Sequence, residues 1–242
     1  MKGILESNYA DDREVKPELK FRFKVRAQVV VDAAIKYLKT SSKLNVLDMG
    51  SADGKTIDEI ENIFNNSRFV GVEFSQELID KHPPFARNNI NLIQGDVTDL
   101  SKIAEPGFFD IVSALALLEH LPYPIKAIKE ANRILKPGGI FVASCPVPFW
   151  DDVSNKLGLL KEDHHETDMT KKLFKKYLLE GGFDFLEYKK FMFAPVSFLP
   201  YLHIPISPKG SLKLDRIIGS FRILNFLFVN QYIVGRKPDR QG

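Results

Sequence analysis

Short apolar segments recur along the first 145 residues, and each is bounded by Gly, Asn, Asp or Pro. Segments with helical periodicity lie among them, at residues 22–39, 55–64 and 124–135. This alternation predicts parallel strands joined by right-handed crossovers, and therefore a doubly wound α/β sheet with helices on both faces. The expected strands are residues 44–49, 69–73, 90–93, 109–113 and 140–144.

The pattern changes after Cys145. A Lys-rich helix is expected at 170–180, followed by strands at 183–191 and 228–235. Because no regular strand–helix unit separates these two strands, we expect an antiparallel pair at one edge of the sheet. Residues 192–227 between them are rich in Phe, Leu, Ile and Pro and too numerous for a hairpin loop. We therefore predict a single domain over 1–242, with an N-terminal helical cap at 1–40 and an insertion at 192–227.

Composition narrows the class of protein. With 44% hydrophobic and 27% charged residues among 242, the chain can bury one large core. Its single cysteine excludes an intramolecular disulfide and a Cys-based metal cluster. The first residues lack the apolar run of a signal peptide and no run of about 18 apolar residues occurs, so we expect a cytoplasmic protein.

Charge is unevenly distributed between the two parts of the chain. The first 150 residues carry 19 basic and 20 acidic residues, and the remainder carries 15 and 11. The basic excess of the second part fits an acidic substrate, a membrane surface or simply a solvated face. No basic stripe is interleaved with aromatic residues, so nucleic acid is not an expected partner.

Candidate chemistry begins at the end of the first expected strand, in Asp48-Met49-Gly50-Ser51-Ala52-Asp53-Gly54. Small residues at 50, 52 and 54 allow a tight turn and the close approach of a ligand to the backbone. The alternative is a strand-to-helix turn that binds nothing. Glu73 ends the second strand, where its carboxylate can accept hydrogen bonds from both hydroxyls of a ribose or can be a solvated tip.

A second carboxylate follows the third expected strand, in Gly95-Asp96-Val97. Asp96 can accept a hydrogen bond from the exocyclic amino group of adenine, with Val97 and Phe74 on the two sides of the ring. Alternatively, Asp96 caps the next short helix. In a doubly wound sheet these strand ends line one crevice, which is where ligands bind.

Five segments within residues 44–146 together resemble the ordered motifs of class I S-adenosylmethionine-dependent methyltransferases: VLDMGSADG, FVGVEFS, LIQGDV, FDIVSALALLEHL and RILKPGGIFVASCP. The small-molecule group of ubiquinone and menaquinone biosynthesis is the most similar. The resemblance implies a seven-stranded Rossmann-like sheet whose last strand is antiparallel, with S-adenosylmethionine as the cofactor.

The resemblance also implies roles for single residues. Asp48 and Gly50, with Ser51 and Gly54 in the same turn, would hold the methionine end of the cofactor, Glu73 the ribose and Asp96 the adenine amino group, with Phe74 and Val97 at the ring and Ala114 beside the sulfonium. Ser51-Ala52 departs from the usual Cys-Gly pair, and Ala52 would tolerate binding if its φ is negative. Arg26 could reach the carboxylate of the cofactor or lie on a solvated helix face.

A methyl sulfonium is already activated, so an enzyme of this kind chiefly aligns the acceptor with the methyl carbon and excludes water. His120 and His165 are the candidate general bases for O- or C-methylation, although His120 could equally be a packing residue and His165 part of a polar loop. Adjacent His164 and His165 rarely present both rings to one ion, so no metal is expected. Ser113-Ala114-Leu115-Ala116 lacks the pattern associated with methylation of base amines.

The acceptor is therefore expected to be a small molecule or a lipid-linked compound. The insertion at 192–227 could roof its pocket, form a dimer surface, contact a membrane peripherally or simply fill the core. Two other functions are compatible with the turn and Glu73: an NAD-dependent oxidoreductase, and a non-catalytic partner protein that binds the cofactor. The insertion offers the aromatic residues Phe193, Phe198, Tyr201, Phe221, Phe226 and Phe228 and the basic residues Lys209, Lys213, Arg216 and Arg222.

Overall fold

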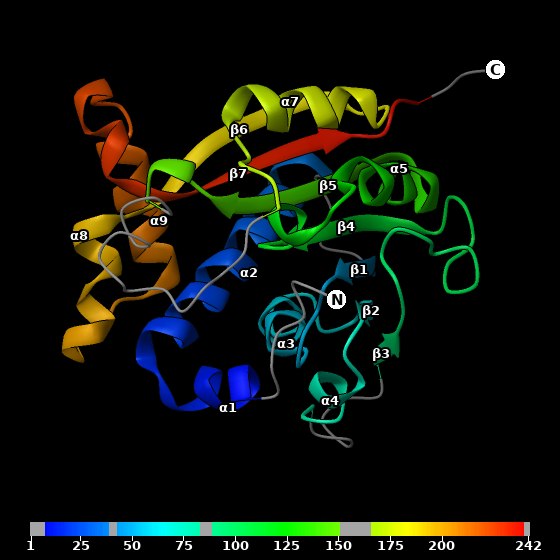
Figure 1. Ribbon diagram of the computed structural model, residues 1–242, viewed down its shortest axis with the longest axis horizontal. Coiled ribbons are helices and arrows are strands. Elements are labelled where there is room, and N and C mark those ends of the chain that lie inside the picture. Colours follow the sequence, from blue (N-terminus) through cyan, green and yellow to red (C-terminus); the bar gives the residue numbers. More distant parts are fainter. Residues whose placement is uncertain (1–7, 39–42, 83–88, 151–165, 240–242) are drawn as a thin grey trace.

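A computed structural model describes residues 8–38, 43–82, 89–150 and 166–239. Seven strands form one sheet in the order β3-β2-β1-β4-β5-β7-β6 (Figure 1). Strands β1 to β5 pair in parallel, whereas β7 is antiparallel to both β5 and β6. The doubly wound sheet and the antiparallel edge pair predicted from the sequence are confirmed. The strands are β1 (Asn45–Met49), β2 (Arg68–Glu73), β3 (Ile90–Gln94), β4 (Phe109–Leu115), β5 (Leu135–Pro146), β6 (Asp184–Phe193) and β7 (Phe228–Arg236).

Helices cover both faces of the sheet. On one face α5 (Pro124–Ile134) and α7 (Lys171–Glu180) bury apolar side chains, and on the other α2 (Pro17–Leu38) and α3 (Lys55–Glu61) do so (Figure 1). Two short helices, α1 (Asn8–Val15) and α4 (Gln76–Ile79), and the 3-10 turn η1 (Leu118–His120) complete this part of the chain. Among the described residues, no helix is both long and apolar enough to cross a bilayer.

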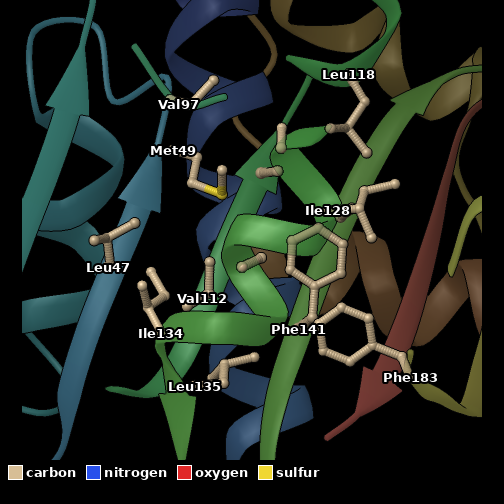
Figure 2. Packing of buried hydrophobic residues seen from close by; sticks show 14 of the residues in the cluster. Leu47, Met49, Val97, Val112, Leu118, Ile128, Ile134, Leu135, Phe141 and Phe183 are labelled. Atoms are coloured by element: carbon tan, nitrogen blue, oxygen red, sulfur yellow. The ribbon is translucent and has the colours of Figure 1, made fainter. Parts of the chain in front are cut away.

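The core on the α5 face fixes the ends of the central strands. Figure 2 shows Met49 of β1 beside Val97, and the rings of Phe141 and Phe183 against each other. These two rings are stacked, with centroids 5.2 Å apart. Dense packing of this kind leaves little freedom to the backbone, so the carboxyl ends of β1 and β4 form a rigid base for a ligand site.

The insertion between β6 and β7 is largely helical. It contains α8 (Ala194–Ser197), η2 (Leu199–Leu202), α9 (Pro208–Ile218) and η3 (Arg222–Leu227). Phe193 at the end of β6 pairs with Phe228 at the start of β7, and Asn230 pairs with Pro146 at the end of β5. The insertion therefore lies at the end of the sheet that is formed by the carboxyl ends of the parallel strands. Phe228 itself is fully buried and belongs to the core, so it does not contribute to a pocket roof.

Asp215 attaches α9 to the end of β6. Its carboxylate accepts hydrogen bonds from the backbone N–H groups of Met192, at 2.8 Å, and Phe193, at 3.1 Å. Met192 is buried and has φ +59, so the chain turns sharply at this point. Burial raises the pKa of the Asp215 carboxyl to about 6, against the opposing effect of the two N–H donors.

We expect Asp215→Ala to lower the free energy of unfolding by about 2 kcal/mol, because two N–H groups, one of them on the buried residue Met192, lose their acceptor. Urea unfolding monitored by circular dichroism measures the change. Asp184→Ala, at the exposed start of the same strand, is the matched control. Equal effects of the two substitutions would contradict an anchoring role for Asp215.

Candidate functional site

The turn between β1 and α3 bends through three left-handed residues, Gly50 (φ +71), Ala52 (φ +49) and Gly54 (φ +75). The N–H groups of Gly50 and Ser51 both donate to the carbonyl of Val72 on the neighbouring strand, at 2.8 and 3.2 Å. The loop is therefore held against the end of β2, and within it only Gly50 is partly accessible, since residues 51–54 are buried.

Glycine is required at both ends of this turn. A Cβ atom at Gly50 would lie 2.8 Å from Cδ1 of Leu117, and one at Gly54 would lie 2.6 Å from the ring of His82. Both glycines also have positive φ, which side chains with a Cβ adopt only with strain. The sequence-based assignment of Gly50 and Gly54 to a tight turn is thus consistent with their geometry.

Ala52 does not have the negative φ on which its tolerance in this turn was made conditional. Its φ of +49 places an alanine in the left-handed region, which costs roughly 1–2 kcal/mol for residues with a Cβ. The N–H of Ala52 donates to Oε2 of Glu73 at 2.9 Å. This hydrogen bond helps to hold Ala52 in its strained conformation.

We expect Ala52→Gly to raise the free energy of unfolding by about 1 kcal/mol, because glycine adopts positive φ without strain. The control is Ala10→Gly, since Ala10 is helical and packs in the same small apolar cluster as Ala52 and Leu78. That substitution should lower stability by about 1 kcal/mol. A loss of stability in both variants, measured by thermal and urea unfolding, would show that Ala52 is not strained.

Asp48 is almost completely buried beneath the turn. Its Oδ1 atom accepts a hydrogen bond from the hydroxyl of Ser113 at 2.7 Å, across the pairing of β1 with β4. Burial raises the pKa of the Asp48 carboxyl to about 7, and the nearby charge of Glu73 acts in the same direction, while Ser113 and the charge of Arg13 oppose it. A cation placed next to Asp48, such as the α-ammonium of an amino acid, would favour its ionised form.

Gly71 is a structural requirement that the sequence reasoning missed. It lies opposite Asp48 in the pairing of β1 with β2. A Cβ at this position would lie 2.6 Å from Oγ of Ser51 and 2.5 Å from Leu92. Ser51 is buried, and its Oγ has no hydrogen-bond partner within the described residues. Glycine within an otherwise β-branched strand segment was the available signal.

Glu73 is held rigidly at the end of β2. Its Oε2 atom accepts the Ala52 N–H, and its Oε1 atom accepts the N–H groups of Phe74 and Ser75, at 2.8 and 3.0 Å. Oε2 retains capacity for a further donor, whereas the two N–H groups occupy both lone-pair sites of Oε1. The next side chain, Phe74, is 43% exposed, which leaves an aromatic surface beside this carboxylate.

Asp96 follows β3 and is exposed. Its Oδ1 atom accepts both the backbone N–H and the hydroxyl of Thr98 at 2.8 Å, which is a local turn contact of the kind that the capping alternative anticipates. The same geometry orients Oδ2 for another donor. Val97 is only 6% exposed and Ala114 is fully buried, both in the core on the α5 face. The predicted adenine sandwich of Val97 and Phe74, and the place of Ala114 beside a sulfonium, remain predictions.

An arginine from the N-terminal helices reaches the turn. Arg13 of α1 is buried and donates through Nη1 to Asp53 at 2.6 Å and through Nη2 to Thr56 at 3.0 Å. Lys55 also lies 2.9 Å from the other oxygen of Asp53. The sequence reasoning did not find Arg13, because only the packing of α1 over the turn brings it there.

Arg26 does not lie on a solvated helix face, which was one of the two expectations for it. Its Nη2 donates to Oδ1 of Asn230 at 3.4 Å, its Nε is buried without a hydrogen-bond partner in the described structure, and burial lowers the pKa of the guanidinium. The charges of Glu119 and Arg13 are near enough to influence that pKa as well. A guanidinium in this setting is suited to binding a carboxylate.

The candidate base His120 is the last residue of η1, which begins three residues after the end of β4, and it is partly buried. His165 lies outside the described residues, as does His164. Among the residues that the structure describes, no group of three or more His, Cys, Asp or Glu side chains could hold a metal ion.

Comparison with known proteins finds similarity over the central part of the chain. Residues 47–143 match the family model described as a methyltransferase domain. A ubiquinone biosynthesis O-methyltransferase from Coxiella burnetii is 33% identical over 111 residues, which are 43% of this chain and 46% of that protein. A demethylmenaquinone methyltransferase from Staphylococcus haemolyticus is 33% identical over 108 residues, 44% of each chain. The chain thus spans less than half the length of these relatives.

Solved structures extend the similarity of fold beyond that segment. The geranyl diphosphate C-methyltransferase of Streptomyces coelicolor A3(2) superposes with a TM-score of 0.61 over 88% of this chain and 78% of its own, at 14% identity. The comparisons give no support to an oxidoreductase or to a non-catalytic partner protein. Residues 47–143 therefore match the methyltransferase-domain family, and the chain has the fold of the class I S-adenosylmethionine-dependent methyltransferases.

Proposed function

We propose that this protein is an S-adenosylmethionine-dependent enzyme that transfers a methyl group to a small-molecule or lipid-linked acceptor. The observation that carries the proposal is the meeting of a strained turn at 50–54 with the oriented carboxylates of Glu73 and Asp96 at the ends of adjacent strands. The names of the relatives, which refer to ubiquinone biosynthesis and demethylmenaquinone, support an acceptor related to quinones. A cytoplasmic location, as expected from the sequence, is part of the proposal.

The residues present fit the chemical groups of this cofactor. Glu73 offers its Oε2 atom as an acceptor to a ribose hydroxyl, and Asp96 offers an acceptor to an adenine amino group. Asp48 and Arg26 are of opposite sign, as an amino-acid ammonium and carboxylate require. Nε of Arg26 and Oγ of Ser51 are buried polar atoms without a hydrogen-bond partner in the described structure. A polar ligand that bonded to them would offset the free-energy cost of their burial.

The chemistry that the protein must supply is modest. When bound, S-adenosylmethionine would supply a methyl group on a positively charged sulfur, and that sulfur would leave as the neutral thioether of S-adenosylhomocysteine. The ends of the strands would bind and orient the cofactor, and the packed core below them would exclude water. His120, five residues after the end of β4, is proposed to accept a proton from a hydroxyl or acidic carbon of the acceptor.

Isothermal titration with S-adenosylhomocysteine tests the cofactor site. Glu73→Ala and Asp96→Ala should each weaken binding by about 1–3 kcal/mol, or roughly 5- to 150-fold, because each removes a charged acceptor. Glu77→Ala, an exposed residue on α4 close to Glu73 in sequence, is the matched control and should bind as the wild type does. Unchanged affinity in both site variants would refute the assigned site.

A thermal-shift comparison separates the proposed activity from its main alternative. S-adenosylhomocysteine should stabilise the protein and NAD should not, since ligands that bind only the folded state raise its stability. Stabilisation by NAD alone would overturn the proposal. Release of S-adenosylhomocysteine across quinone precursors and other phenolic acceptors would then identify the acceptor class.

A further inference from the structure

The outer side of the insertion exposes an unusual amount of apolar surface. Its exposed apolar side chains are between 45% and 81% accessible. Figure 1 places α8 and α9 together at one end of the molecule, beyond α2, so these residues lie at the periphery of the fold. We call them the insertion surface: Phe198, Tyr201, Leu202, Ile204, Ile217, Phe221, Ile223 and Phe226.

Charge on the insertion has one sign. Lys209, Lys213, Arg216 and Arg222 are exposed, whereas the only acidic residue of 194–227 is Asp215, which is buried against the N–H groups at the end of β6. Arg216 is paired at 2.6 Å with Asp32 of α2. The remaining three cations have no acidic partner within 194–227, because Asp215 is the only acidic residue of that segment and it is buried.

The insertion surface adjoins the side of the sheet that holds the proposed cofactor site. Trp150, a few residues after β5, donates through Nε1 to the carbonyl of Phe226 at 2.8 Å, and Val147 donates its N–H to the carbonyl of Val229. Phe149, between them in sequence, is 53% exposed and extends the apolar surface. The insertion and the segment after β5 therefore meet at the same end of the sheet, where the parallel strands have their carboxyl ends.

We propose that the insertion surface is an interfacial contact with an anionic lipid bilayer. Aromatic and aliphatic side chains would enter the boundary between headgroups and acyl chains, while Lys213 and Arg222 would lie among the phosphates. A protein partner is a poorer match, because the buried centres of protein interfaces are depleted of lysine. The proposal does not depend on methyl transfer, although a lipid-linked acceptor would reach the strand ends directly from such a surface.

Vesicle co-sedimentation of the full chain tests the proposal. Vesicles of phosphatidylcholine with phosphatidylglycerol, in about equal amounts, should bind the protein, and vesicles of phosphatidylcholine alone should bind it weakly. The double substitution of Phe221→Ser with Ile223→Ser should lower the partition coefficient at least about tenfold, because two large apolar side chains lose their burial. Lys213→Gln with Arg222→Gln should lower it about fivefold for each charge removed.

A matched control lies on α7, where Leu179 is 51% exposed beside a group of lysines. Leu179→Ser should leave the partition coefficient unchanged, and retained binding of S-adenosylhomocysteine should show that every variant is folded. Absence of wild-type binding to the anionic vesicles, or equal binding by the Phe221/Ile223 variant, would overturn the proposal. So would a concentration-dependent dimer, seen by light scattering, that the same variant abolishes without any vesicle binding. Each of these outcomes leaves the cofactor titration as a separate test of the proposed function.

Discussion

Asp48→Asn is expected to make the free protein more stable at pH 8, by about 2–4 kcal/mol, while weakening its binding of the cofactor. Burial raises the pKa of Asp48 from 3.8 to about 7, so the folded state favours the neutral carboxyl. The stability that comes from the neutral form is fully present below pH 3.8 and is lost as the pH rises through about 7. Asparagine stays neutral and can still accept the hydroxyl of Ser113, so it keeps that stability at every pH.

The measurement is urea unfolding at several pH values between 4 and 8. The wild type should lose stability relative to Asp48→Asn over this range, and the difference should level off above pH 8. Asp184→Asn, an exposed carboxyl on β6, should reproduce the wild-type slope. A variant less stable than the wild type at pH 8 would show that Asp48 is ionised and stabilising in the free protein.

Arg13→Ala is expected to lower the free energy of unfolding by about 3 kcal/mol. Removing one partner of a buried ion pair leaves the other charge without compensation, and Asp53 is only 1% exposed. Lys55 remains 2.9 Å from Asp53, which keeps the expected loss at the lower end of the range for such pairs. Arg13 also lies over the rings of Tyr9 and Phe23, so its removal takes away packing as well as charge.

Lys16→Ala provides the comparison, because Lys16 forms an ion pair of similar length, 2.7 Å, with the exposed Asp12 on the same helix. Exposed pairs contribute little, so this variant should unfold close to the wild type. If both substitutions have the same small effect in urea unfolding, α1 does not depend on its contact with the turn. If only Arg13→Ala is destabilised, α1 and the turn fold as a unit.

The sheet could be predicted because its strands are short, apolar and separated by turn residues. The first and last residues of the helices and strands were harder to predict. Helix α2 begins at Pro17 rather than at residue 22, because proline suits a first helical turn and Phe21 is already buried. Strand β5 begins at Leu135 rather than 140, where its pairing shifts from Phe109 to Ile111 and accommodates Lys136-Pro137-Gly138-Gly139 as an irregularity.

The candidate site could be predicted only in part. Asp48, Glu73 and Asp96 stand at strand ends, and the topology of a doubly wound sheet brings such ends together. Arg13 reaches the turn from about 40 positions away, and the burial of Arg26 depends on β7 from the far end of the chain. Neither relation follows a local spacing. The helices inside 192–227 were also missed: α8 and η2 are four residues long each, too short to show a period, and the apolar and Pro-rich composition of the segment indicated an insertion without elements of its own.

Glu73 engages three backbone N–H groups before any ligand arrives. A side chain already confined to one rotamer loses little further entropy on binding, so most of its interaction with a ribose would count directly toward affinity. One of the three donors lies in the turn and the other two lie directly before α4, so this binding site is assembled when the chain folds. Recognition at this strand end is then a matter of complementarity to a rigid surface rather than of adjustment around the ligand.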